Sequence, residues 1–203
     1  ISEGVYELSS RLEIEYLNLA VGEKSGLIEV NCGFYGFTPT NYKLNSMKSI
    51  KDASEDEILT LWSGLGFYKR ARNIFQTKEI LHSEHKGRFP KNFDKIIGLP
   101  GIGKSTAGAI MSIAYQIPTP ILDGNVKRIL QRYFSNEKNI FSEKELWNLS
   151  LSVSNATNSN LYTQGIMDIG ATICIPQNPK CSRCPLTVNC NSAFLKTDAV
   201  KNK

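Results

Sequence analysis

Four cysteines near one end of the chain constrain its fold more than any other feature of the sequence. Cys174, Cys181, Cys184 and Cys190 lie within seventeen residues, with the spacing C-x6-C-x2-C-x5-C. Such a cluster is typical of a metal site. Zinc sites usually pair two short cysteine knuckles, whereas four thiolates on unequal loops suit an iron–sulfur cubane whose irons each take one ligand. From the spacing alone, zinc and a [4Fe-4S] cluster both stay open, with disulfides as the third alternative.

The composition of the chain narrows its compartment and its partners. Of the five cysteines, Cys32 stands apart, and this odd total argues against a secreted disulfide framework and for a reducing compartment. The sequence has no run of eighteen apolar residues, so we expect no membrane span. The net charge of +5 favours a polyanionic partner. We expect a cytoplasmic protein in a bacterium, or a nuclear or mitochondrial one in a eukaryote.

Helix signals follow one another from about residue 52 onward, so we expect an all-α fold. Capping boxes, glycines and prolines delimit the expected helices, which are one after Ser54 that ends at Gly64, then residues 67–87, 92–98, 105–114 and 125–134, one after Ser142, and residues 162–172. Residues 4–45 show mixed periodicity and no clear helix signal. We expect three parts, which are a divergent N-terminal segment (1–45), a helical domain (46–134) and a helical cysteine-containing domain (135–203).

A glycine-rich turn lies between two of the expected helices. In Leu99-Pro100-Gly101-Ile102-Gly103 the glycines allow a tight turn, and the amides of residues 101–105 then point outward at the positive end of the next helix, where a phosphate oxygen can bind. Lys104 adds a positive charge. An ordinary helix connection is the alternative, but the apolar run before the turn and the small-residue helix after it favour a helix-hairpin-helix element that holds the DNA backbone without reading sequence.

Asp123 is the candidate catalytic carboxylate. It follows a proline-stiffened link and precedes a helix, so it suits an N-cap aspartate, which stabilises a helix by about 1 kcal/mol. It also suits a carboxylate held beside a sugar on which positive charge develops when an N-glycosidic bond breaks. Both roles can coexist, because a capping position fixes the side chain. Lys127 and Arg128, one turn further on, are either DNA-backbone contacts or part of a solvated face.

Two aromatic residues lie at the start of the helix expected at residues 67–87. Phe67 follows Gly66 and could wedge between bases when a nucleotide is flipped out of the duplex. We expect Tyr68, next to it, to belong to the core.

Four motifs agree in order with one known family. LWSGLGFYKRARN, LPGIGKSTAGAI, PILDGNVKR and QGIMDIGATIC, together with the cysteine spacing, resemble the endonuclease III superfamily of DNA glycosylases, and specifically adenine DNA glycosylases of the MutY type. The resemblance covers residues 47–192. Bifunctional members resemble LPGVGRKTA, with a lysine nucleophile where this chain has Ser105. Lys104 is one residue away, which on a helix turns its side chain about 100° aside and argues against a Schiff-base lyase.

The resemblance implies a helix-hairpin-helix glycosylase fold whose four cysteines hold a [4Fe-4S] cluster. It implies a monomeric enzyme that hydrolyses the glycosidic bond of adenine mispaired with 8-oxoguanine or guanine in double-stranded DNA. Asp123 would stabilise the sugar cation, Ser105 would lie in the base pocket, and Phe67 would intercalate. DNA contacts would fall on Leu99, Gly101, Gly103, Lys104, Asn125, Lys127, Lys180 and Arg183, with a monovalent cation at the hairpin.

The segment that would contain the catalytic acid matches the family less well than the other motifs do. The family places a glutamic acid in a segment like LSEVMLQQTQV, whose start Ile1-Ser2-Glu3 resembles, but the residues from Gly4 onward depart from it. Glu3 is therefore the candidate acid. Two alternatives stay open, a catalytically impaired DNA-binding fragment of the same family and an endonuclease III-like glycosylase with lyase activity.

Overall fold

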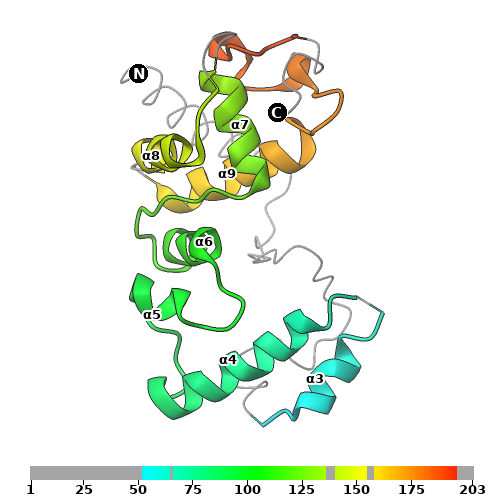
Figure 1. Ribbon diagram of the computed structural model, residues 1–203, viewed down its shortest axis with the longest axis vertical. Coiled ribbons are helices and arrows are strands. Elements are labelled where there is room, and N and C mark those ends of the chain that lie inside the picture. Colours follow the sequence, from blue (N-terminus) through cyan, green and yellow to red (C-terminus); the bar gives the residue numbers. More distant parts are fainter. Residues whose placement is uncertain (1–51, 65, 136–139, 155–157, 196–203) are drawn as a thin grey trace, which may run out of the picture. The chain divides into compact units, whose positions relative to one another are not determined.

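The computed structural model describes residues 52–64, 66–135, 140–154 and 158–195 (Figure 1). Within these ranges the chain forms helices joined by turns and loops, and no strand, so the expected all-α fold is confirmed for them. None of the helices in the described ranges is long and apolar enough to cross a membrane. Glu3, Cys32 and the segment 1–45 lie outside the described residues.

The described residues divide into two compact units, one that ends at Gly103 and one that begins at Lys104. The sequence suggested a boundary between residues 134 and 135, whereas the structure has it between 103 and 104. The physical reason is a shared core, since buried side chains between residues 121 and 133 pack with those of residues 146–169 in one hydrophobic cluster.

The first unit contains α3 (Glu55–Leu61), α4 (Lys69–His85) and α5 (Phe93–Ile97). The predicted capping box is present at α3, where the Ser54 hydroxyl accepts from the Glu57 amide at 3.2 Å. Helices α3 and α4 pack together through a small apolar cluster. The C-cap of α4 is Lys86, and Lys86 and Gly87 both have positive φ. This places the end of α4 close to the predicted residue 87.

The glycine-rich turn follows α5. As predicted, Asn92 begins this short helix by accepting from the Lys95 amide at 3.0 Å, and Gly98 is its C-cap. The Ile102 amide then donates to the Leu99 carbonyl at 3.1 Å, which closes the turn.

The second unit contains α6 (Lys104–Ala114), α7 (Gly124–Phe134), α8 (Glu143–Ser154) and α9 (Ser159–Thr172). Helix α9 packs against the other three helices. The side chains of the hydrophobic core of this unit are buried. The Ser142 and Glu145 side chains form the predicted capping box of α8. Helix α9 begins three residues earlier than predicted, because the Asn158 side chain accepts from the Leu161 amide and caps it.

The cysteine segment follows α9 and contains two short 3-10 turns, η2 (Cys181–Arg183) and η3 (Thr187–Asn189). Leu186, between them, is 3% exposed and belongs to the core of this unit. The Thr187 hydroxyl donates to the carbonyls of Cys181 and Cys184 and so ties the two turns together. The segment is thus packed against the helices, although it has little regular structure of its own.

Candidate active site and cysteine cluster

Asp123 holds a fixed position at the start of α7. Its Oδ1 atom accepts from the Asn125 amide at 3.0 Å and from the Val126 amide at 2.8 Å. Neither bond uses Oδ2, and the positive end of the helix favours a negative charge at this position. The predicted N-cap is confirmed. The carboxylate is therefore oriented by the backbone before any ligand is present.

Ser105, on the first turn of α6, lies beside this carboxylate's backbone. Its Oγ atom accepts from the amide of Leu122, the residue before Asp123, at 3.0 Å. The structure therefore brings together Ser105 and Asp123, which are eighteen positions apart in the sequence. The same link is held further along by Ser112, whose hydroxyl donates to the Thr119 carbonyl at 3.0 Å and accepts from the Thr119 amide at 3.2 Å.

Gly108 allows α6 to approach the link that leads to Asp123. A Cβ atom at this position would lie 2.2 Å from the Pro120 carbonyl oxygen and 3.1 Å from Cγ2 of Ile121. Since Ile121 is buried and the Pro120 carbonyl belongs to the backbone, neither can move away at low cost.

The substitution Gly108→Ala is expected to lower the free energy of unfolding by about 1–3 kcal/mol, because the added methyl group forces α6 and the link apart. Chemical denaturation monitored by circular dichroism measures this loss. Gly103→Ala is the control, because its Cβ would meet nothing within 4 Å, and it should stay within about 1 kcal/mol of the parent protein. Equal stability of the two variants would contradict the close approach.

Arg128, on α7, joins this helix to the end of α9. Its guanidinium donates to the Gly170 carbonyl at 2.6 Å, to the Cys174 carbonyl at 2.7 Å and to the Asn125 side-chain oxygen at 2.8 Å. A Cβ on Gly170 would lie 2.6 Å from Asn125 Cβ, so the two helices touch here. The Arg128 side chain thus links α7 to the end of α9 within this unit. This fits neither of the two roles predicted for it, which were a DNA contact and a part of a solvated face.

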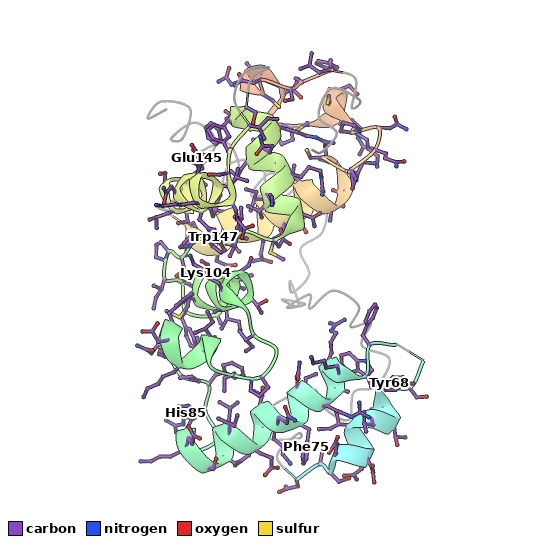
Figure 2. The ribbon with its side chains drawn as sticks, viewed as in Figure 1. Tyr68, Phe75, His85, Lys104, Glu145 and Trp147 are labelled. Atoms are coloured by element: carbon purple, nitrogen blue, oxygen red, sulfur yellow. The ribbon has the colours of Figure 1, made fainter. Side chains whose placement is uncertain are left out.

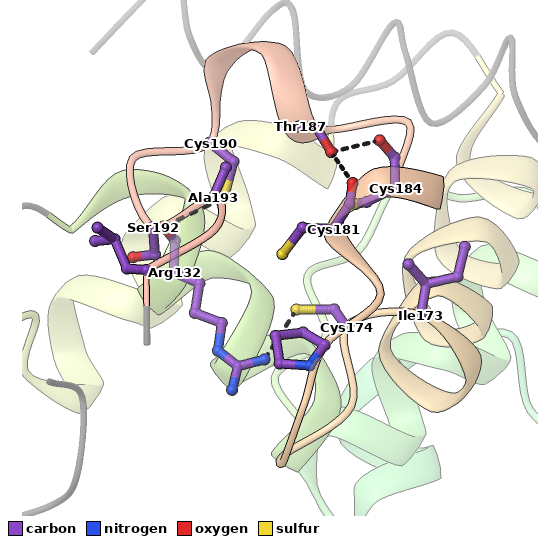
Figure 3. A pocket seen from close by; sticks show the side chains of 11 residues that line it. Arg132, Ile173, Cys174, Cys181, Cys184, Thr187, Cys190, Ser192 and Ala193 are labelled. Atoms are coloured by element: carbon purple, nitrogen blue, oxygen red, sulfur yellow. Dashed lines mark hydrogen bonds between the residues drawn. The ribbon is translucent and has the colours of Figure 1, made fainter. Parts of the chain in front are cut away.

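The four clustered cysteines line one pocket together with Arg132 and Thr187 (Figure 3). All four are free thiols and half-buried. Burial, together with the charges of the other three thiols, raises the pKa of Cys190 to about 11. Burial also raises the pKa of Cys184. Thiols bind metals as thiolates, so binding of a metal here would release their protons.

The four thiols are soft donors that line one pocket. Among the described residues, no group of three or more His, Cys, Asp or Glu side chains could hold one metal ion. A tetrahedral zinc with Zn–S bonds of about 2.3 Å would require sulfurs about 3.8 Å apart. Thiolates on a cubane bind different irons and stand farther apart around a larger body. Soft thiolate donors around one pocket are compatible with an iron–sulfur cluster, the centre expected from the sequence.

The residues predicted to contact DNA have different surroundings. Phe67 is 82% exposed, and so is available as a wedge. Tyr68 is 44% exposed, so the expectation that it belongs to the core was wrong. Leu99 is only 3% exposed, which leaves its backbone, and not its side chain, for any DNA contact. Gly101 and Gly103 are both exposed, and Gly101 has a positive φ of 76°.

Two of the basic residues predicted to contact DNA lie close to another side chain. The Lys104 ammonium lies 4.0 Å from the centroid of the Trp147 ring of α8 (Figure 2). Lys127 is exposed and lies 3.8 Å from a Glu143 carboxylate oxygen. Lys180 and Arg183 are exposed on the cysteine segment. The predicted DNA contacts of all four residues stay predictions.

The sequence of this chain is similar to those of known DNA repair proteins. Residues 30–151 match the family described as the HhH-GPD superfamily of base excision DNA repair proteins. The chain belongs to this superfamily. An HhH-GPD relative from Buchnera aphidicola of Acyrthosiphon pisum, named adenine DNA glycosylase, is 50% identical over 150 residues, which are 71% of this chain and 42% of the relative. The fission yeast protein of the same name is 35% identical over 154 residues, 73% of this chain and 33% of its own length.

Solved structures of HhH-GPD-like enzymes share the fold. A thermostable thymine-DNA glycosylase superposes with a TM-score of 0.66 at 28% identity, and an endonuclease III bound non-covalently to DNA with a TM-score of 0.60 at 25% identity. Each comparison covers 74% of this chain and 71% of the other. The chain spans less than half the length of the curated relatives described above.

Sequence reasoning missed several residues that shape this HhH-GPD site. Arg132 and Gly108 were not singled out, and Arg128 was given another role. Their partners lie far away along the chain, as with Arg128 and the Cys174 carbonyl, 46 positions apart. The one local signal was the small-residue composition of α6, which indicated close packing without naming the partner.

Proposed function

We propose that this chain forms the core of a monofunctional adenine DNA glycosylase, which hydrolyses the N-glycosidic bond of adenine mispaired with 8-oxoguanine or guanine. The observation that carries the proposal is the Asp123 carboxylate, fixed by two amides at the start of α7 beside Ser105. Curated relatives at 50% and 46% identity, both named adenine DNA glycosylase, support the choice of base.

Asp123 would act through its charge. As the bond to the base breaks, positive charge develops on the sugar, and a preorganised carboxylate stabilises it without having to reorient. Oδ1 is occupied by the two amides of α7, so Oδ2 would face the sugar. Protonation of the leaving adenine falls to Glu3, and a water molecule would complete the hydrolysis.

The position of Ser105 favours hydrolysis over lyase chemistry. A lyase needs an amine that attacks the sugar and forms a Schiff base. Ser105 offers a hydroxyl, which already accepts from the Leu122 amide, and the neighbouring Lys104 ammonium stacks on Trp147. No amine of this turn is thus directed to Asp123. This supports a glycosylase whose product keeps an intact strand.

The DNA partner would be a duplex containing the mispaired adenine, bound by one copy of the chain. Phe67, exposed on a left-handed turn, would enter the base stack, and the turn at residues 98–103 would bind phosphate, with or without a monovalent cation. Lys180 and Arg183 would bind phosphates near the cysteine segment.

The four cysteines would hold a [4Fe-4S] cluster, which when bound supplies a rigid cationic body that keeps the thiolates charged and the segment folded. The chain's own contribution is the pocket, whose cysteines Cys174, Cys184 and Cys190 pack against the core that includes Leu186. Thr187 joins the two turns of the segment. This orders the loop on which Lys180 and Arg183 stand. The cluster would take no part in the hydrolysis.

A single-turnover assay of adenine release from an 8-oxoguanine:adenine duplex tests the proposal. We expect adenine to be released and the strand to break only after alkali, with no covalent adduct trapped by borohydride. The protein should absorb near 410 nm and contain iron. Tight duplex binding without release would favour the catalytically impaired fragment, and a trapped adduct would favour the lyase; either result would overturn the proposal.

A further inference from the structure

Arg132 contacts the cysteine segment where the segment begins. Its guanidinium donates to the Sγ atom of Cys174 at 3.4 Å (Figure 3). It also donates to the Ile175 and Pro176 carbonyls, both at 2.8 Å. The planar guanidinium therefore donates to acceptors on three consecutive residues, a geometry that the ammonium of a lysine cannot reproduce. One of the three acceptors is a predicted cluster ligand.

The backbone of the same residue contacts the segment where it ends. The Ser192 amide donates to the Arg132 carbonyl at 3.1 Å. The Asn191 amide donates to the next carbonyl, that of Tyr133, at 3.2 Å. These carbonyls lie in the last turn of α7, where helix geometry leaves acceptors without intrahelical donors.

We infer that Arg132 is a positioning residue for the cluster. It holds the two ends of the cysteine segment, near Cys174 and near Cys190, to one turn of α7. The side chain holds Cys174 and the backbone holds the Cys190 end, although these cysteines are sixteen positions apart. The guanidinium also places a positive charge against the Cys174 sulfur, which favours the more reduced cluster. This inference rests on the proposed cluster.

Two substitutions at this position separate its two contributions. Arg132→Met removes the fork and the charge but keeps an apolar stem, whereas Arg132→Lys keeps the charge without the fork. Lys144→Met, on the exposed surface of α8, is the charge-matched control. The parent chain and its variants are purified anaerobically, and circular dichroism checks their helix content. Iron loss under an excess of chelator is then followed by the decay of absorbance near 410 nm.

We expect Arg132→Met to lose iron roughly 10- to 100-fold faster than the parent protein, as for other residues that orient metal ligands. Arg132→Lys should also lose iron faster, but its cluster should keep a reduction potential close to that of the parent, whereas the potential of Arg132→Met should fall. Lys144→Met should match the parent in both measurements. A purely structural role would not move the potential.

The outcomes separate this inference from the proposed cofactor. Iron loss at the parent rate in both Arg132 variants would overturn the positioning role while leaving the cluster in place. Equal potentials in Arg132→Met and Arg132→Lys would overturn the role of the charge. A parent protein that carries no iron after anaerobic purification would overturn the cluster itself. If Arg132→Met fails to fold, Arg132→Lys carries the comparison of rates.

Discussion

Asp123→Asn is expected to lower the single-turnover rate of adenine release by roughly 10²- to 10³-fold, the loss typical when one preorganised electrostatic contact is removed. Asparagine keeps an oxygen that can accept from the Asn125 and Val126 amides, and it is as good an N-cap as aspartate. The substitution therefore removes the charge and leaves α7 capped. Adenine release is measured under enzyme excess, with duplex affinity measured separately.

Asp123→Ala provides the comparison that separates charge from capping. It loses both functions, so it should be as slow as Asp123→Asn and also less stable by about 1 kcal/mol. Unfolding curves of the two variants measure this difference. Adenine release by Asp123→Asn at the parent rate would show that the carboxylate acts only as a helix cap.

Arg128→Met is expected to lower the free energy of unfolding by about 3 kcal/mol, because it leaves partly buried acceptors without their charged donor. Those acceptors are the Gly170 and Cys174 carbonyls and the Asn125 side chain. The methionine stem fills much of the same space, so the loss reports the polar contacts. Thermal and denaturant unfolding of the second unit's helices measure it.

Lys127→Met is the matched control, one residue away on the same helix. Lys127 is exposed, and its ion pair with Glu143 at 3.8 Å should contribute less than about 1 kcal/mol. Arg128→Lys should recover little of the loss, since an ammonium cannot reach several acceptors in one plane. Similar unfolding midpoints for Arg128→Met and Lys127→Met would contradict the role of Arg128 as a tie.

The parts of the fold that sequence predicted well are those whose physical cause lies within a few residues. The Ser54–Glu57 and Ser142–Glu145 capping boxes, and Asp123 at the start of its helix, depend on partners two or three positions away. A pattern of side-chain types can therefore identify them. The same holds for the all-α fold, which follows from periodicity and breakers.

The parts that sequence did not predict depend on distant partners. The contacts of Arg132 with Cys174 and of Ser105 with Leu122 bridge 42 and 17 positions. Nothing near Arg132 distinguishes it from the exposed Lys127 on the same helix. The burial of Leu99 and the exposure of Tyr68 likewise depend on what packs around them, which a short motif does not contain.

The turn that carries Phe67 conflicts with what folding alone would select. Gly64, Gly66 and Phe67 all have positive φ, and at Phe67 this conformation costs about 1–2 kcal/mol while the ring stays in water. Engineering for thermal tolerance or solubility would replace that phenylalanine with glycine or asparagine. Such a variant would purify more easily and melt later, and it would have discarded the aromatic ring proposed to enter the base stack. Ranking variants of this protein by robustness alone therefore selects against the function we propose.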